Sequence, residues 1–210
     1  MEDVIQVIVN DFTKGTGVNM EQNYSLFKGY KLIFWGIFFT SFNFNFFGIP
    51  ILPQFIEWFI VCSGIKMLKE VHPSKTLIKA GNWGTWIVLF TLIVGFISLF
   101  EPDIFKNGTL FTLIWSTGIT TMQLILKYFI LVGSIEILEV FHKQDVTEKY
   151  AKSTRNYIMS YILVTVVQTI VLTIVSEIGM VALGIASLIM NIWLMILISE
   201  LKKIYNTEVV

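Results

Sequence analysis

Six long apolar runs, separated by short polar segments, dominate the hydrophobic pattern of the chain. They cover about residues 30–47, 51–68, 83–100, 109–141, 157–175 and 180–199. A helix that crosses the roughly 30 Å hydrocarbon core of a bilayer needs about 20 apolar residues. The pattern therefore predicts an all-α fold, a polytopic membrane protein with six transmembrane helices arranged as three hairpins.

The first two runs are separated by Gly48-Ile49-Pro50 and by Pro53, which break a continuous helix and indicate a tight hairpin. Asn43 and Asn45 alternate with phenylalanines just before this turn. Such a period of two is not helical, so we expect the first helix to unwind there.

The composition leaves little material for a soluble domain. Hydrophobic residues make up 55% of 210 positions and charged residues 14%, whereas a soluble domain has about 25% charged residues. We expect three parts: a cytoplasmic or interfacial N-terminal segment (1–29), a transmembrane domain (30–201) and a cytoplasmic tail (202–210).

The positive charges predict the orientation. Thirteen of the fifteen Lys and Arg residues fall in the N-terminal region, the two longer loops and the C-terminal tail. The exceptions are Lys106, in a short loop, and Lys127, within the fourth run. Cytoplasmic loops are enriched in Lys and Arg, so both termini are expected in the cytoplasm. Dividing the fourth run into two spans would place a basic loop outside, and we reject that topology.

The fourth run carries a polar seam. At 100° per residue, seven of its polar side chains fall within about 60° of the direction of Lys127; they are Thr109, Thr112, Ser116, Thr120, Gln123, Lys127 and Ser134. Lipid cannot satisfy such a face. The seam therefore lines a path for a ligand or ion, or it packs against neighbouring helices.

Two charges lie within spans. Lys127 is expected close enough to the cytoplasmic boundary for its side chain to snorkel; if it is buried instead, it needs an anionic partner. Glu57 is expected about two turns into the second helix, in a helix interface or reaching the outer surface. Their depths differ by roughly 14 Å at 1.5 Å per residue, so direct contact is not expected.

The last two runs contribute small and polar residues at helical spacing, including Gln168 and Asn191, which are expected to pack helices together. His72 and His142 lie in the two cytoplasmic loops, and their spacing indicates no metal site. With no enzyme motif and a single cysteine, Cys62, the sequence predicts no catalytic centre, metal or cofactor.

The stretch FNFNFFGIPILPQFIEWFIVCSGIKML resembles a hairpin of uncharacterised small multi-pass membrane proteins of Gram-positive bacteria, with a pattern close to N-x-x-x-G-x-D-I-L-P-D-F-I-G. Asn43 or Asn45, Gly48 and the I-L-P-x-F-I segment match. Pro50 and Gln54 replace the acidic positions, and Glu57 replaces the last glycine. The resemblance implies a bacterial plasma membrane and no particular activity.

Two functions remain open. The seam, Lys127 and Glu57 favour a small transport- or channel-type bundle. The lack of catalytic motifs and the small size favour a non-catalytic accessory, immunity or regulatory subunit. The expected partners are the lipid bilayer and a membrane protein or second copy of the chain, not nucleic acid. The candidate path residues are Lys127, Glu57, Gln123, Thr120, Ser116, Gln168 and Asn191.

Overall fold

The computed structural model describes residues 20–42, 45–46, 49–50, 53–100, 110–142, 144–174 and 177–206. The predicted N-terminal segment and the last residues of the tail lie largely or wholly outside these ranges. The described part is all-α apart from one pair of two-residue strands. Its helices are α2 (Met20–Phe42), α3 (Gln54–Val71), α4 (Lys75–Phe100), α5 (Leu110–Phe141), α6 (Gln144–Ile174) and α7 (Glu177–Asn206).

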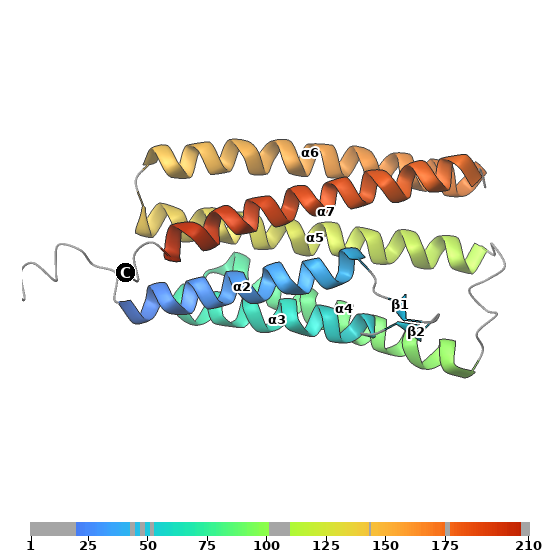
Figure 1. Ribbon diagram of the computed structural model, residues 1–210, viewed down its shortest axis with the longest axis horizontal. Coiled ribbons are helices and arrows are strands. Elements are labelled where there is room, and N and C mark those ends of the chain that lie inside the picture. The colour runs from blue at the N-terminus through green and yellow to red at the C-terminus, as the bar shows by residue number, and fades with distance from the viewer. Residues whose placement is uncertain are drawn as a thin grey trace, which may run out of the picture.

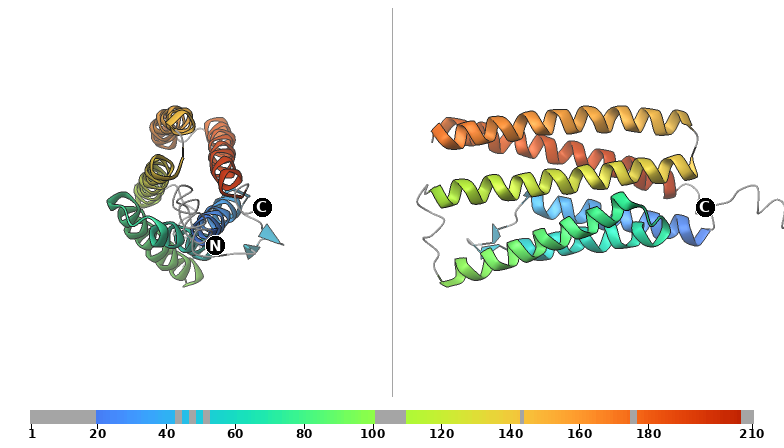
Figure 2. Two further views of the ribbon diagram at one scale, coloured as in Figure 1. Left: turned by 90° about the vertical axis from the view of Figure 1, so that its left-hand side faces the viewer. Right: turned by 180° about the vertical axis from the view of Figure 1, so that it is seen from behind.

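The helices form a ring. Each packs against the next in sequence, and α7 closes the ring against α2 (Figures 1 and 2). Successive helices run in opposite directions, so the start of α2 and the end of α7 lie at the same end of the bundle (Figure 1). The predicted all-α class is confirmed, and both ends of the described bundle lie on one side. We call this side the charged end.

The first hairpin turns through a short β-ladder. Strand β1 (Asn45–Phe46) pairs antiparallel with β2 (Ile49–Pro50), with Asn45 opposite Pro50. The predicted unwinding is confirmed, because α2 ends at Phe42 and Asn45 is extended. The predicted span boundaries at residues 47 and 51 are wrong, because α2 ends at Phe42 and α3 begins at Gln54.

Three helices begin well before their apolar runs. α2, α4 and α6 start at Met20, Lys75 and Gln144, whereas the apolar runs start at residues 30, 83 and 157. Hydropathy detects only the apolar part of a helix, and these polar turns continue the same helices at the charged end. α5 is one uninterrupted helix, as expected from the rejection of a divided fourth run.

Glycines set the separation of α2 and α3. A Cβ on Gly64 would lie 2.6 Å from the carbonyl oxygen of Gly29, and a Cβ on Gly36 would collide with a methyl group of Val61. Small residues at such positions let helix backbones approach closely, which favours packing where hydrophobic burial is not a driving force. The close fit of the two helix backbones therefore holds the α2–α3 pair together.

The α3–α4 and α4–α5 interfaces each contain one close glycine contact of the same kind. A Cβ on Gly84 of α4 would lie 2.6 Å from Sγ of Cys62 in α3, and one on Gly133 of α5 would lie 2.6 Å from Leu77 in α4. Beside Gly133, the Thr76 hydroxyl donates a 2.5 Å hydrogen bond to the Glu136 carboxylate. Glycine contacts thus extend from α2 to α5.

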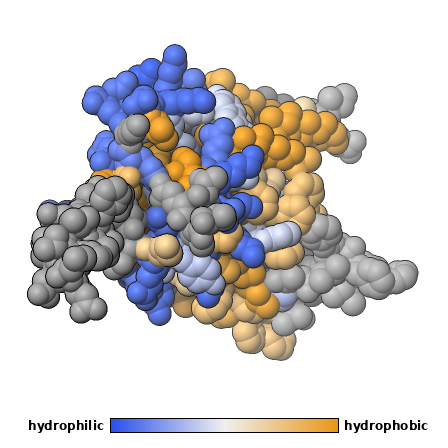
Figure 3. Space-filling model, turned by 60° about the vertical axis from the view of Figure 1, so that its left-hand side comes forward, coloured by the Kyte–Doolittle hydropathy of each residue, from blue (hydrophilic) through white to orange (hydrophobic). Residues whose placement is uncertain are grey.

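Two described segments, Lys75–Ile97 and Val181–Asn206, are long and apolar enough to cross a membrane. Only 22% and 28% of their apolar windows is buried inside the bundle, whereas the core helix of a soluble protein is mostly buried. Hydrophilic side chains gather at the charged end, and hydrophobic ones cover much of the flank (Figure 3). The described helices thus expose apolar side chains along their length.

Candidate functional site

Lys127 lies inside the bundle, where three helices meet. Its side chain is 3% exposed. Nζ donates hydrogen bonds to the phenol oxygen of Tyr161 on α6, at 3.0 Å, and to Oδ1 of Asn191 on α7, at 2.8 Å. The expectation that Lys127 snorkels is wrong, because its ammonium is directed across the bundle to two neighbouring helices. We call Lys127, Tyr161 and Asn191 the lysine node.

The position of the node follows from the helices that carry it. Lys127 lies fourteen residues before the end of α5, about 21 Å along the axis from the charged end. Its neighbour Leu126 and the next helical turn, Ile130 and Leu131, are buried apolar residues. The charge therefore lies among buried apolar side chains on the inward face of α5.

Neutral groups stabilise this charge. Besides the two oxygen acceptors, the Tyr161 ring lies under the ammonium, with Nζ 4.4 Å from its centroid, a cation–π contact. Among the described residues, no carboxylate forms an ion pair with Lys127. The expectation of an anionic partner for a buried Lys127 is therefore not met within the described chain.

The node has donors left over. An ammonium has no acceptor, so Asn191 must present its oxygen to Lys127, and its amide NH₂ is directed elsewhere. Because the Tyr161 oxygen accepts from Lys127, its own O–H is the group that remains to be donated. One positive charge is thus combined with an O–H and an N–H that can donate to a further group, which is the chemistry that binds an anion.

Glu57 is separate from the node. It lies in the first turn of α3, nearer the helix end than the two turns predicted, and is 4% exposed. A carboxylate in a first turn interacts favourably with the helix dipole. The structure records no contact between Glu57 and Lys127 in the described chain.

Two hydroxyls of the described polar seam are satisfied within their own helix. The Thr120 hydroxyl donates to the Ser116 carbonyl and the Ser134 hydroxyl to the Ile130 carbonyl, each at 2.8 Å. On α6, Thr165 and Thr169 do the same. Such bonds let hydroxyl groups lie in apolar surroundings. They favour the packing interpretation for these hydroxyls.

The other candidates are not brought together. Gln123 and Gln168 are half-buried and take no part in the lysine node. Thr109 and the side chain of Thr112 lie outside the described residues. Among the described candidate path residues, Lys127 and Asn191 are the pair that the structure joins across different helices.

The sequence reasoning missed Tyr161 and the row of hydroxyls that leads to it. On α6, five residues at alternating spacings of three and four are all buried: Thr147, Tyr150, Thr154, Tyr157 and Tyr161. We call them the hydroxyl ladder. Spacings of three and four place residues on one face of a helix, so this regularity was the available signal.

The ladder begins at a pocket of about 490 Å³ between α5 and α6 at the charged end, which we call the acidic pocket. Its lining is Glu139, His142, Gln144, Thr147, Glu148 and Ala151. The His142 ring packs against Tyr205 of α7, 5.1 Å between centroids. No group of three metal-ligating side chains occurs among the described residues.

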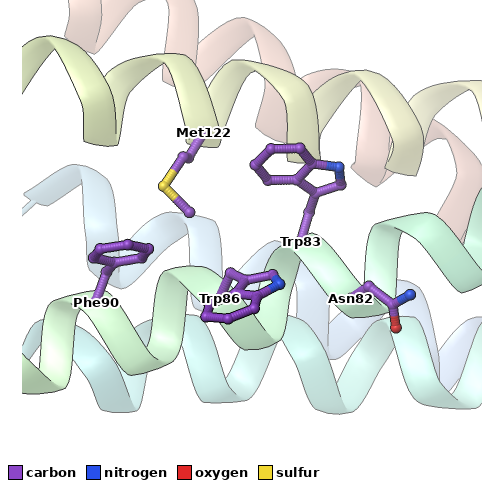
Figure 4. Close-up of a pocket in the computed structure, with 5 residues that line it drawn as sticks. All are labelled: Asn82, Trp83, Trp86, Phe90 and Met122. Carbon is purple, nitrogen blue, oxygen red and sulfur yellow. The ribbon is translucent and has the colours of Figure 1, made fainter.

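A second hollow lies on the flank of the bundle. The groove between α4 and α5, about 670 Å³, is lined by Asn82, Trp83, Trp86, Phe90 and Met122 (Figure 4). The Met122 side chain reaches from α5 toward the aromatic rings of α4 (Figure 4). This aromatic groove is almost wholly apolar and is separate from the lysine node.

Comparisons of the chain with known protein families, with curated proteins and with solved structures give no match.

Proposed function

We propose that the chain is a multi-pass protein of a bacterial plasma membrane, with all six helices spanning the bilayer and the charged end in the cytoplasm. Three observations support this arrangement. Among the described Lys and Arg residues, only Lys127 lies away from the charged end. Large apolar side chains are exposed along the helices. Hydroxyls on α2 to α6 donate to carbonyls of their own helix.

We further propose that the bundle transports a small anion and that Lys127 is the charged centre of its path. The observation that carries this proposal is a buried ammonium whose recorded protein partners are all neutral. Charged side chains inside membrane helices are costly and mark ion or substrate sites. An anion bound at the node would neutralise Lys127 and accept from the remaining donors of Tyr161 and Asn191.

The test is anion flux into vesicles that contain the purified protein and a halide-quenched dye, with iodide as the probe. Wild-type vesicles should admit iodide faster than protein-free vesicles. Lys127→Met should reduce the rate to the protein-free level, because the apolar side chain fills the site without its charge. Lys79→Met is the matched control, since Lys79 is exposed on α4 and its Nζ lies over Phe129.

Flux that is unchanged in Lys127→Met, or absent from the wild type, contradicts the proposal. A second measurement examines the path. In a Cys62→Ser background, cysteines at Ser116, Thr120 and Gln123 should react with a water-soluble thiol reagent if the seam borders water. Uniform protection of all three would assign the seam to packing.

The aromatic groove favours a second candidate function, an accessory or regulatory subunit. An exposed apolar hollow lined by two tryptophans fits a helix of a membrane partner. Purification in mild detergent should then retain a stoichiometric partner, and Trp86→Ala should release it. A lone monomer with intact anion flux would exclude this candidate.

A further inference from the structure

The hydroxyl ladder contains polar atoms for which the described protein offers no hydrogen-bond partner. The phenol oxygens of Tyr150 and Tyr157 and the hydroxyl of Thr154 are buried with no partner at hydrogen-bond distance, and Tyr150 and Thr154 lie close enough to interact with each other. A buried hydroxyl left unsatisfied destabilises the folded state. A hydrogen bond between Tyr150 and Thr154 would use only one of their two O–H donors, so the other donor and the Tyr157 phenol are left for a further hydrogen-bonding species.

The Tyr30 phenol on α2 faces the same part of the interior. It is buried and lies close enough to interact with Ser134 of α5 and with Tyr150. Burial holds the pKa of the Tyr150 phenol well above its usual range. The phenol therefore stays protonated, and this part of the interior presents neutral groups that both donate and accept.

The hydroxyl ladder runs from the acidic pocket to the lysine node. Thr147 belongs both to the ladder and to the lining of the acidic pocket. Tyr161, fourteen residues further along α6, bonds to Lys127. At 1.5 Å per residue, this is about 21 Å of helix. The unsatisfied hydroxyls lie between these ends, at Tyr150, Thr154 and Tyr157.

We propose that the hydroxyl ladder holds a chain of buried water molecules that connects the acidic pocket with Lys127. Buried water usually makes about three hydrogen bonds to polar groups that would otherwise be unsatisfied, and hydroxyls repeating every turn of α6 provide such sites. The chain would let the lysine node exchange protons with the charged end of the bundle.

The mouth of the ladder fits water and protons better than an anion. Glu139 and Glu148 line the acidic pocket together with His142. Carboxylates repel anions, whereas they accept hydrogen bonds from water and attract cations such as hydronium. The inference therefore adds a route for protons and does not depend on the proposed transport of an anion.

The test is radiolytic hydroxyl-radical footprinting of the full chain in lipid nanodiscs, read by mass spectrometry and normalised to the intrinsic reactivity of each residue type. Water beside a buried side chain generates radicals that modify it in place. Tyr150, Tyr157 and Tyr161 should be modified several-fold more than the buried aliphatic residues of the α2–α3 interface, Leu26, Ile33 and Leu68. Equal protection of both groups would overturn the proposal.

A variant tests whether the water forms a continuous chain. Tyr157→Phe removes one hydroxyl from the middle of the ladder and should reduce the modification of Tyr161 several-fold. Tyr128→Phe, at an exposed position of α5, should leave it unchanged. Unchanged modification of Tyr161 in Tyr157→Phe would show separate waters and no chain. The wild-type measurement decides the main claim even if this variant does not fold.

Discussion

The α2–α3 pair and the α5–α6–α7 group hold their helices together by different means. Between α2 and α3, glycines bring the backbones so close that an added Cβ on Gly64 would collide with the Gly29 carbonyl. On α5 and α7, the described Gly118 and Gly184 have open space at the Cβ position. There, Lys127 of α5 donates hydrogen bonds to Tyr161 of α6 and Asn191 of α7.

The difference has a functional consequence. Close packing of two backbones at glycines is possible in one arrangement and tolerates no added atom. The α2–α3 pair is therefore expected to be rigid. A contact made by hydrogen bonds can exchange one partner for another, such as water or an anion, without repacking the helices. The chemistry of this protein is therefore expected in the α5–α6–α7 group.

The largest effect is predicted at the glycine contact. Gly64→Val places branched carbon atoms against the α2 backbone, which cannot yield as a flexible side chain can. Overpacking of this kind costs about 3 kcal/mol. The free energy of unfolding, measured by denaturing-detergent titration in mixed micelles, should fall by that amount.

Gly95→Val is the matched control, because nothing lies within 4 Å of its Cβ position. It should unfold close to wild type. Equal losses in the two variants would mean that valine acts through helix propensity and that the α2–α3 contact is not shape-limited.

The next largest effect is predicted at the node. Asn191→Leu removes an acceptor and leaves the Lys127 charge buried, which should lower the free energy of unfolding by about 2 kcal/mol. In the double variant Lys127→Met/Asn191→Leu, most of this loss should be recovered, because exchanging both partners for apolar groups is nearly neutral. A double variant as unstable as Asn191→Leu would show that Asn191 acts independently of Lys127.

Much of the fold could be predicted from the sequence. Six helices, their alternating directions and the turn near Gly48 follow from apolar runs and from prolines, which are local signals. The starts of α2, α4 and α6 were predicted too late, since their first turns are polar and carry charges such as Lys28 and Lys149.

The site was accessible only in part. Lys127 stood out as the basic residue that the topology did not explain, but its partners lie 34 and 64 positions further along the chain. No local sequence pattern predicts how α6 and α7 are rotated about their axes, and this rotation brings Tyr161 and Asn191 to Lys127. The hydroxyl ladder, by contrast, is a local regularity, and it went unnoticed because tyrosine was counted as an apolar residue.

A smaller effect is predicted for Tyr161→Phe. The variant loses the 3.0 Å hydrogen bond to Lys127 but keeps an aromatic ring beneath the ammonium. We expect the free energy of unfolding to fall by about 1 kcal/mol, the net value of one hydrogen bond. Tyr161→Leu should lose more, because the cation–π contact is also removed. If the two variants unfold alike, the ring contributes nothing to holding the charge.

The smallest effect is predicted for Thr120→Val, in the polar seam of α5. The Thr120 hydroxyl already donates to the Ser116 carbonyl, so toward a bound anion it presents only lone pairs, which an anion does not use. Polar groups at such helix contacts contribute about 0.6 kcal/mol, and the loss of stability should not exceed this. Iodide flux in vesicles should match that of the wild type. A strong loss of flux at unchanged stability would show that the Thr120 hydroxyl turns toward the permeating ion, and the seam would then belong with the lysine node as part of the path.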